Sequence, residues 1–206
     1  MLWDISPPVS ACTPVFPGDT PYRQRWTSTL GPDSAANVGE ITMSLHVGAH
    51  ADAPLHYDAR GAAIGLVDLT PFLGPCRVIH AIGCGPLVEW PHLAHALDGL
   101  PPRVLVRTCE HASVERWNDD LTAFAPATIE RLGALGVRLV GIDTASIDPA
   151  ASTALESHQV VRRLDIRVLE NLVLDAVPEG DYELVALPLK LVTADASPVR
   201  AVLRKP

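Results

Sequence analysis

The sequence lacks a long apolar run, an internal repeat and any low-complexity tract. Its longest apolar runs fall well short of the roughly 20 residues that a membrane-spanning helix needs, so we expect no membrane association. Prolines are frequent instead: 19 of them interrupt the chain, which excludes a coiled coil or a helical repeat. At 206 residues, 48% hydrophobic and 19% charged, the chain is expected to form one globular domain over residues 1–206.

Basic residues are scarce relative to acidic ones, with 16 Lys and Arg against 24 Asp and Glu and a formal net charge of −8. Proteins that bind nucleic acid without sequence preference rely on clustered Lys and Arg to neutralise phosphates. The charge balance therefore predicts no nucleic-acid partner and favours a small-molecule substrate.

Cysteine is also rare, and the four cysteines, Cys12, Cys76, Cys84 and Cys109, do not have the close spacing of a zinc ribbon. No basic and apolar leader precedes Asp4, so we expect a cytoplasmic protein with free thiols. Cys76 lies within one apolar stretch and Cys109 ends another, so both are expected to be small core residues rather than nucleophiles.

The order of apolar segments predicts an α/β fold with a mixed β-sheet core and flanking helices. The first third is rich in Pro and Gly and is typical of turns and antiparallel strands, which we expect to join the sheet. Predicted strands cover residues 23–30, 40–46, 77–81, 104–107, 138–143, 167–170 and 184–189. One helix is predicted after Pro126, ending near Gly136, and another over residues 156–164.

One segment, HVGAHADAPLHY, alternates polar or special residues with apolar ones. The even positions are His46, Gly48, His50, Asp52, Pro54 and His56. Because an extended chain turns successive side chains to opposite faces, this pattern would gather imidazoles and a carboxylate on one side. These groups bind zinc, manganese and similar divalent ions, so the segment predicts a metal site on a strand and its exit loop.

A helix is the alternative for this segment, because His46 and His50 are four positions apart, as in zinc-protease helices. Gly48 between them and Pro54 soon after count against a helix, and the preceding residues already alternate as in a strand. On this interpretation Gly48 leaves room beside the metal. A polar strand face without metal is the remaining alternative. The other histidines, His80, His92, His95 and His111, have no matching pattern and are expected to be structural or exposed.

The same motif resembles the signature of the cyclase-like metal-dependent hydrolases, and in particular the bacterial kynurenine formamidases. The resemblance extends to WDISPP, TPVFPGDTPY, SHQVVRRLDIRVLENLVLDAV and LVALPLKLVTADASPVRAVL, which together span nearly the whole chain. It implies the cyclase-like fold, a swivelling β/α/β arrangement. A difference from the wider family is Ala49, where threonine is common.

The resemblance implies two divalent metal ions per chain, zinc first, with manganese or cobalt as alternatives. One ion would be held by His46, His50 and Asp52. The other would be held by Asp52, His158 and Glu170, with Asp52 bridging. On composition alone, neither His158 nor Glu170 would be singled out.

Two further residues gain a role from the resemblance. His56 would be the proton donor and acceptor, for which an imidazole with a pKa near neutrality is suited, or it would merely support a ligand. Phe16 matches a position where these enzymes usually carry a tryptophan that packs on the substrate. An aromatic ring is retained there, although a core position beside Pro17 is the alternative.

The activity implied is hydrolysis of N-formyl-L-kynurenine to L-kynurenine and formate, a step of tryptophan degradation by the kynurenine pathway, in a homodimer. Two alternatives stay open. One is another amide or lactam hydrolase of the family, such as an isatin-hydrolase-like enzyme. The other is a non-catalytic metal-binding protein.

Overall fold

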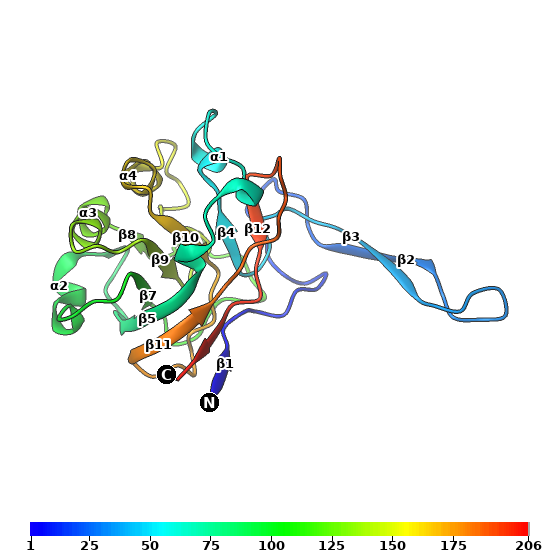
Figure 1. Cartoon of the computed structure of the whole chain (residues 1–206), viewed down its shortest axis with the longest axis horizontal. Coiled ribbons are helices and arrows are strands. Elements are labelled where there is room, and N and C mark those ends of the chain that lie inside the picture. The colour runs from blue at the N-terminus through cyan, green and yellow to red at the C-terminus, as the bar shows by residue number, and fades with distance from the viewer. Residues whose placement is uncertain (206) are drawn as a thin grey trace.

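A nine-stranded mixed sheet forms the centre of the computed structural model, which describes residues 1–205 (Figure 1). The strand order is β1-β13-β11-β5-β7-β9-β10-β4-β12. The central strands β5, β7, β9 and β10 run parallel, and the strands on either side join antiparallel. The strands are β1 (Leu2–Asp4), β4 (His50–Asp52), β5 (Leu73–His80), β7 (Arg103–Arg107), β9 (Leu139–Ile142), β10 (Arg167–Glu170), β11 (Gly180–Val185), β12 (Ala196–Pro198) and β13 (Val202–Arg204).

Three helices lie side by side against one face of the sheet, α2 (Trp90–Leu93), α3 (Pro126–Ala134) and α4 (Glu156–Leu164) (Figure 1). A fourth, α1 (Pro54–Tyr57), follows β4, and the short strands β6 (Leu87–Val88) and β8 (Ala123–Phe124) pair with each other. Helix α3 begins at Pro126, because proline at the first helical position gives up no hydrogen bond. Both helices predicted from the sequence are confirmed, and with the mixed sheet they confirm the α/β fold. Within residues 1–205 no helix has the length and apolar character needed to cross a bilayer.

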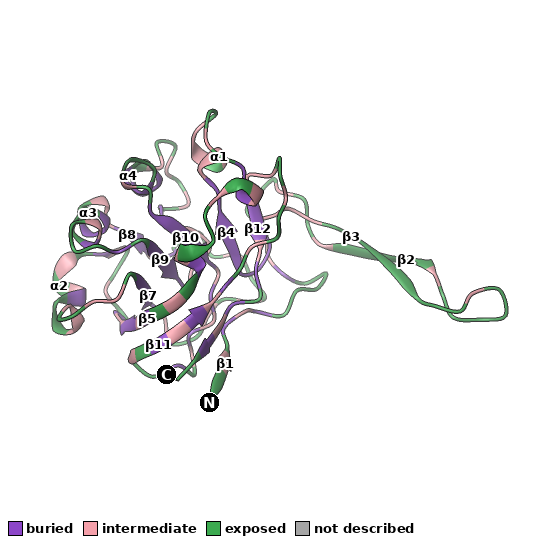
Figure 2. Ribbon diagram, viewed as in Figure 1, coloured by how far each residue is buried: buried purple, intermediate pink, exposed green. Residues whose placement is uncertain are grey.

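The central strands are buried on both faces, which explains their unbroken apolar runs (Figure 2). In β7, Val104 and Val106 belong to the apolar cluster on the helical side, which also holds Ile129 of α3. Leu105 between them belongs to the second cluster, on the other face, with Phe72. One strand therefore contributes to two cores.

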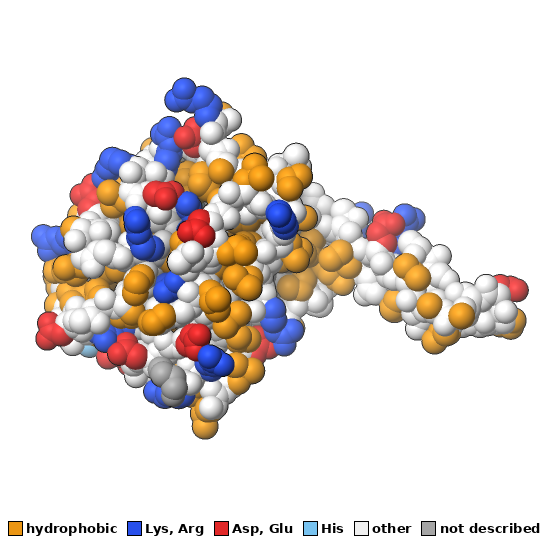
Figure 3. Space-filling view, in the orientation of Figure 1, with side chains coloured by type: hydrophobic (Ala, Val, Ile, Leu, Met, Phe, Trp, Pro, Cys, Tyr) orange, Lys and Arg blue, Asp and Glu red, His pale blue; other side chains and the backbone are white. Residues whose placement is uncertain are grey.

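A two-stranded arm, β2 (Arg23–Ser28) and β3 (Val38–Thr42), projects from the body (Figure 1). Within residues 1–205 its strands pair only with each other, and its apolar side chains Trp26, Val38 and Ile41 are at least half exposed. Figure 3 shows hydrophobic side chains on the surface of the arm. The prediction that the amino-terminal strands join the main sheet is therefore wrong for the arm, although it is right for β1 and β4. Alternation predicts a strand, but it does not predict its partner.

Several predicted strand boundaries are also wrong. The strand expected over residues 77–81 is β5, which begins at Leu73, and the one expected over residues 23–30 is β2, which ends at Ser28. Prolines explain two further differences. The strand expected over residues 40–46 ends at Thr42, whose partner Arg23 is the first residue of β2 after Pro21, which has no N–H to donate. The strand expected over residues 184–189 is β11, which ends at Val185, three residues before Pro188.

Candidate metal centre

Three elements bring buried imidazoles and carboxylates together at one end of the sheet. Strands β4 and β10 pair so that His50 lies opposite Glu170, and His50 Nε2 is 3.2 Å from Glu170 Oε2. Asp52 is two residues further along β4, so its side chain is on the same face as that of His50. His158, from the first turn of α4, places its Nε2 3.2 Å from Asp52 Oδ2. All four side chains are nearly inaccessible to solvent.

His46, which precedes β4 in the chain, and His56, which follows it in α1, complete the cluster. His46 Nδ1 is 3.2 Å from Asp52 Oδ1, and the rings of His46 and His56 are 4.3 Å apart between centroids. The strand expected to lead into the motif over residues 40–46 does not reach it; the strand of the motif is His50–Asp52, and the short helix α1, which starts at Pro54, stands where an exit loop was expected. Pairing with β10 and the turn at Pro54 gather these residues.

The structure requires glycine at position 48 for a different reason from the predicted one. It adopts a φ of +67°, and a Cβ at this position would lie 2.9 Å from Val9 Cγ2. The prediction that Gly48 leaves room for the metal is therefore wrong. The glycine permits a left-handed turn and the close approach of the amino-terminal segment.

The donor set fits divalent metal ions. Among the described residues, His50 Nε2 and Asp52 Oδ1 are buried without a hydrogen-bond partner, although buried polar atoms nearly always have one. His50 Nδ1 lies 2.9 Å from the carbonyl oxygen of Gly48, which directs its other nitrogen into the cluster. Potential ligand atoms fall within 4.8 Å of one another in two trios, His46–Asp52–His56 and His50–Asp52–Glu170, and Asp52 is common to both.

Two carboxylates that hold the histidines were not identified from the sequence. Asp148 Oδ2 lies 2.7 Å from His158 Nδ1, which leaves His158 Nε2 for the cluster. Asp195 Oδ2 lies 3.0 Å from His46 Nε2 and 3.3 Å from His56 Nδ1. No spacing rule connects residues 139 or more positions apart, so the only sequence signal for Asp195 was its place in the TADASP segment.

The hydrogen bonds set the charge of the cluster. Burial acts against the charged imidazole of His158, but hydrogen bonds to Asp148 and Asp52 outweigh it and raise its pKa to about 10. His46 behaves in the same way, with Asp195 and Asp52 as its partners, and its pKa is also about 10. The hydrogen bond from His46 lowers the pKa of Asp195 to about 2. Burial acts against the charge of Asp52 too, but hydrogen bonds from His158 and His46 hold its pKa well below the usual value, so it is ionised at neutral pH, as a ligand of a divalent cation must be.

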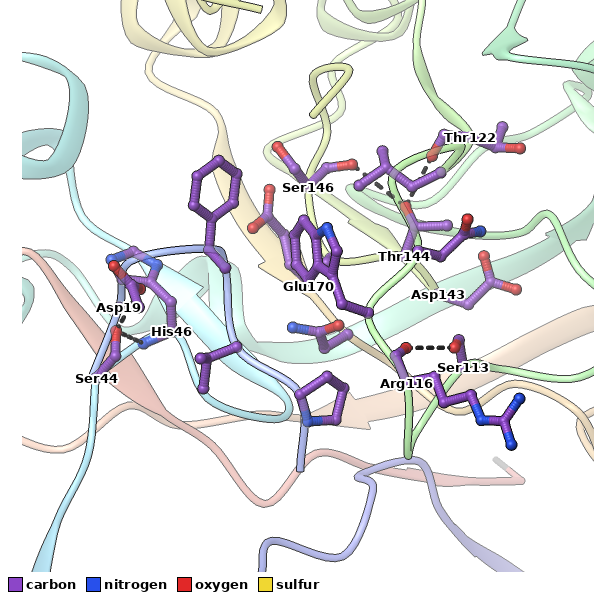
Figure 4. A pocket seen from close by; sticks show the side chains of 18 of the residues that line it. Asp19, Ser44, His46, Ser113, Arg116, Thr122, Asp143, Thr144, Ser146 and Glu170 are labelled. Carbon is purple, nitrogen blue, oxygen red and sulfur yellow. Dashed lines mark hydrogen bonds between the residues drawn. The ribbon is translucent and has the colours of Figure 1, made fainter. Parts of the chain in front are cut away.

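A cavity of about 850 Å³ opens onto His46, His56, His158 and Glu170. Phe16 and Trp117 line it as an edge-to-face pair with ring centroids 5.2 Å apart. Figure 4 shows His46 and Ser44 on one side of the cavity and Ser113 and Arg116 on the other. An aromatic pair beside a polar cluster suits a ligand with an aryl ring and a polar reacting group. Trp117 was not identified from the sequence, because it lies in a loop without periodicity.

The residues predicted to be structural have other partners. His80 Nε2 lies 2.9 Å from the carbonyl oxygen of Val177, and His95 pairs with Glu179. Cys76 is fully buried, and Cys109 donates to Asp143 at 3.1 Å. Burial and the charge of Asp143 raise the pKa of the Cys109 thiol to about 12, so it is a poor nucleophile, as predicted.

Solved structures of metal-dependent hydrolases share this fold. One, described as a potential metal-dependent hydrolase with cyclase activity, has a TM-score of 0.85 and 28% identity, covering 100% of this chain and 99% of that chain. Isatin hydrolase A from Labrenzia aggregata has the same fold, with a TM-score of 0.83 at 22% identity, covering 98% of this chain and 93% of its own. The fold and the site define a metal-dependent hydrolase.

Proteins with similar sequences indicate which kind of metal-dependent hydrolase this chain resembles. The kynurenine formamidase of Delftia acidovorans is 71% identical over 203 residues, 98% of this chain and 97% of the relative. That of Bordetella pertussis is 70% identical over 204 residues, 99% and 98% of the two chains. The putative cyclase family matches residues 3–149, and this chain belongs to it.

Removal of metal is expected to lower the thermal stability of the protein. Chelation would leave His50 Nε2 and Asp52 Oδ1 buried without partners, and ligand binding to the folded state stabilises it. A metal present at a thousand times its dissociation constant contributes about 4 kcal/mol, or roughly 10 °C in a chain of this size. Thermal unfolding followed by circular dichroism, before and after chelation and after metal is restored, measures the shift. An unchanged melting temperature in a sample shown to have lost its metal would contradict the prediction.

Proposed function

We propose that this chain hydrolyses N-formyl-L-kynurenine to L-kynurenine and formate, as a step of tryptophan degradation. The observation that carries the proposal is the buried cluster beside an aromatic pair in one cavity, in a chain 71% identical to a protein named kynurenine formamidase. The reacting group of this substrate is a formamide on an aryl ring, which matches that combination.

The proposed metal complement is two zinc ions, with manganese or cobalt as alternatives. His46, His50 and Asp52 would hold one ion, and Asp52, His158 and Glu170 the other. In support, Asp52 lies within 3.5 Å of an imidazole nitrogen of His46, His50 and His158. When bound, such ions supply a Lewis acid for the formyl carbonyl and lower the pKa of a water to roughly 7.

His56 is proposed as the group that transfers the proton. Its side chain is 30% exposed, whereas those of His50 and His158 are at most 2% exposed, so it can meet a substrate. Asp195, 3.3 Å from Nδ1, would hold the proton on that nitrogen and leave Nε2 free. As the oxygen of water bonds to the formyl carbon, the free Nε2 of His56 would accept a proton from that water. His56 would return this proton to the anilide nitrogen as the carbon–nitrogen bond breaks, which releases the amine and formate.

Phe16 is proposed to pack on the aryl ring of the substrate. Replacing it with alanine is expected to raise KM several-fold with little change in kcat, because the ring binds ground state and transition state alike. Initial-rate kinetics on the purified variant measure both constants. Leu66→Ala, which removes a 65% exposed side chain outside the cavity, is the control. An unchanged KM in the Phe16 variant would remove this residue from the substrate site.

The enzyme is proposed to be a cytoplasmic homodimer. An isolated two-stranded hairpin is marginal in water, and the arm exposes Trp26 and Ile41, so a second copy that covers the arm would stabilise it. Sedimentation equilibrium of the wild type and of a Trp26→Ser, Ile41→Ser variant tests this. A wild-type protein that stays monomeric would contradict it.

The proposed activity is tested by turnover of N-formyl-L-kynurenine before chelation, after chelation and after zinc or manganese is restored, with bound metal counted in the same samples. Release of kynurenine that follows the metal content, with about two ions per chain, is the expected result. Two bound ions without turnover would reject the substrate and direct attention to other amides and lactams. A protein without bound metal would reject the site as well.

A further inference from the structure

The charged side chains around the cavity are very unevenly distributed. Among the described residues that line it, Arg116 is the sole Lys or Arg. The acidic residues of the lining are Asp19, Asp120, Asp143, Glu170 and Asp195. His46 and His158 already pair with carboxylates of the cluster, so Arg116 is the side chain of the lining best placed to attract an anionic group away from that cluster.

In the described part of the chain, Arg116 has no partner for its charge. Within residues 1–205 its guanidinium makes no hydrogen bond or ion pair, whereas Arg77 pairs with Asp181 and Arg162 pairs with Asp58. Its side chain is exposed, so the guanidinium is available to a ligand.

The loop that carries Arg116 has local hydrogen bonds on both sides of this residue. The Ser113 hydroxyl donates to the carbonyl oxygen of Arg116 at 2.6 Å, and the indole N–H of Trp117 donates to Asp119 at 2.7 Å. The next residue, Trp117, packs against Phe16 with ring centroids 5.2 Å apart. Arg116 thus stands beside the aromatic pair. In Figure 4 it lies across the cavity from His46, with its side chain extending away from Glu170.

We propose that Arg116 binds the α-carboxylate of the substrate and so selects aryl formamides that carry an amino-acid side chain. This inference rests on the proposed function. With the formyl group at the histidines and the ring at Phe16 and Trp117, the amino-acid end is directed toward the side of the cavity where Arg116 lies. A guanidinium presents paired N–H donors that match both oxygens of a carboxylate, which an amide or an alcohol in the same place cannot do.

The test compares two substrates that differ in one charge, N-formyl-L-kynurenine and its α-methyl ester, on the wild type and on Arg116→Gln. The variant is expected to raise KM for the acid about 10- to 100-fold, the range for a charge-assisted hydrogen bond, with kcat within about twofold. For the ester, kcat/KM is expected to be the same in both proteins. Arg116→Lys, which keeps the charge but loses the paired donors, should fall between them.

The control variant is Arg138→Gln, which removes an exposed arginine outside the cavity and should leave both substrates unaffected. Equal losses on acid and ester in Arg116→Gln, or no loss on either, would overturn the role of Arg116 while the wild-type activity kept the proposed function. A wild type that turns over neither substrate would overturn both. Bound metal, counted in every variant, should be the same as in the wild type.

Discussion

Replacing Asp52 with alanine is expected to remove both the bound metal and the activity. Asp52 is fully buried in the centre of the cluster, with His46 Nδ1 and His158 Nε2 each 3.2 Å from its carboxylate. Two hydrogen bonds and the surrounding imidazoles hold its pKa well below the usual value against the effect of burial, so it is an anion shared by both proposed ion sites. Even the loss of an outer-sphere partner costs a metal site roughly 10- to 100-fold, so the loss of this ligand should exceed that range.

Metal analysis of the purified variant, together with turnover at saturating substrate, measures the effect. Asp52→Asn keeps the shape of the side chain and removes its charge, so it separates packing from ligation. Asp181→Ala is the matched control, because it removes a carboxylate that pairs with Arg77 on the surface. Asp181 is in β11, which is separated from β4 in the sheet by β5, β7, β9 and β10. Retained turnover in a metal-analysed Asp52→Ala protein would count heavily against the proposed site.

The part of the site that follows from the sequence is the part built by local geometry. His50 and Asp52 alternate along β4 as their spacing indicates, and the prediction that their side chains share a face is confirmed. His158 and Glu170 have ordinary sequence surroundings, and only the resemblance pointed to them. Glu170 reaches the cluster through the pairing of β10 with β4, and His158 reaches it from α4, 106 positions from Asp52 in the chain.

The other residues of the site could not be predicted from the sequence, because no local pattern connects them with the residues that they contact. Asp148 and Asp195 act through hydrogen bonds to histidines that are 10 and 149 positions away, and neither distance has a periodic signature. Trp117 and Phe16 are in two loops about 100 positions apart, and their rings meet in the lining of the cavity. For the arm, alternation correctly predicts strands. It does not show that β2 and β3 pair with each other instead of joining the main sheet, because alternation carries no information about the partner of a strand.

His56→Ala is expected to keep the metal and lose turnover, by about 10²- to 10⁴-fold in kcat, the usual contribution of general acid–base catalysis. His56 is more exposed than the other histidines of the cluster, and its side chain contacts the carboxylate of Asp195 rather than the central carboxylate Asp52. Metal analysis and kcat are measured on the same preparation. His95→Ala, which removes an exposed histidine paired with Glu179, is the control.

A second substrate distinguishes the loss of the proton donor in His56→Ala from a structural disruption of the site. A formanilide with an electron-withdrawing nitro group leaves as a more stable anion and depends less on a proton, so its turnover should fall much less in His56→Ala than that of N-formyl-L-kynurenine. The geometry also defines the opposite result, because His56 lies in one trio of potential ligand atoms with His46 and Asp52. If His56→Ala loses metal, and both substrates lose turnover equally, then His56 is a ligand and the proton must come from another group.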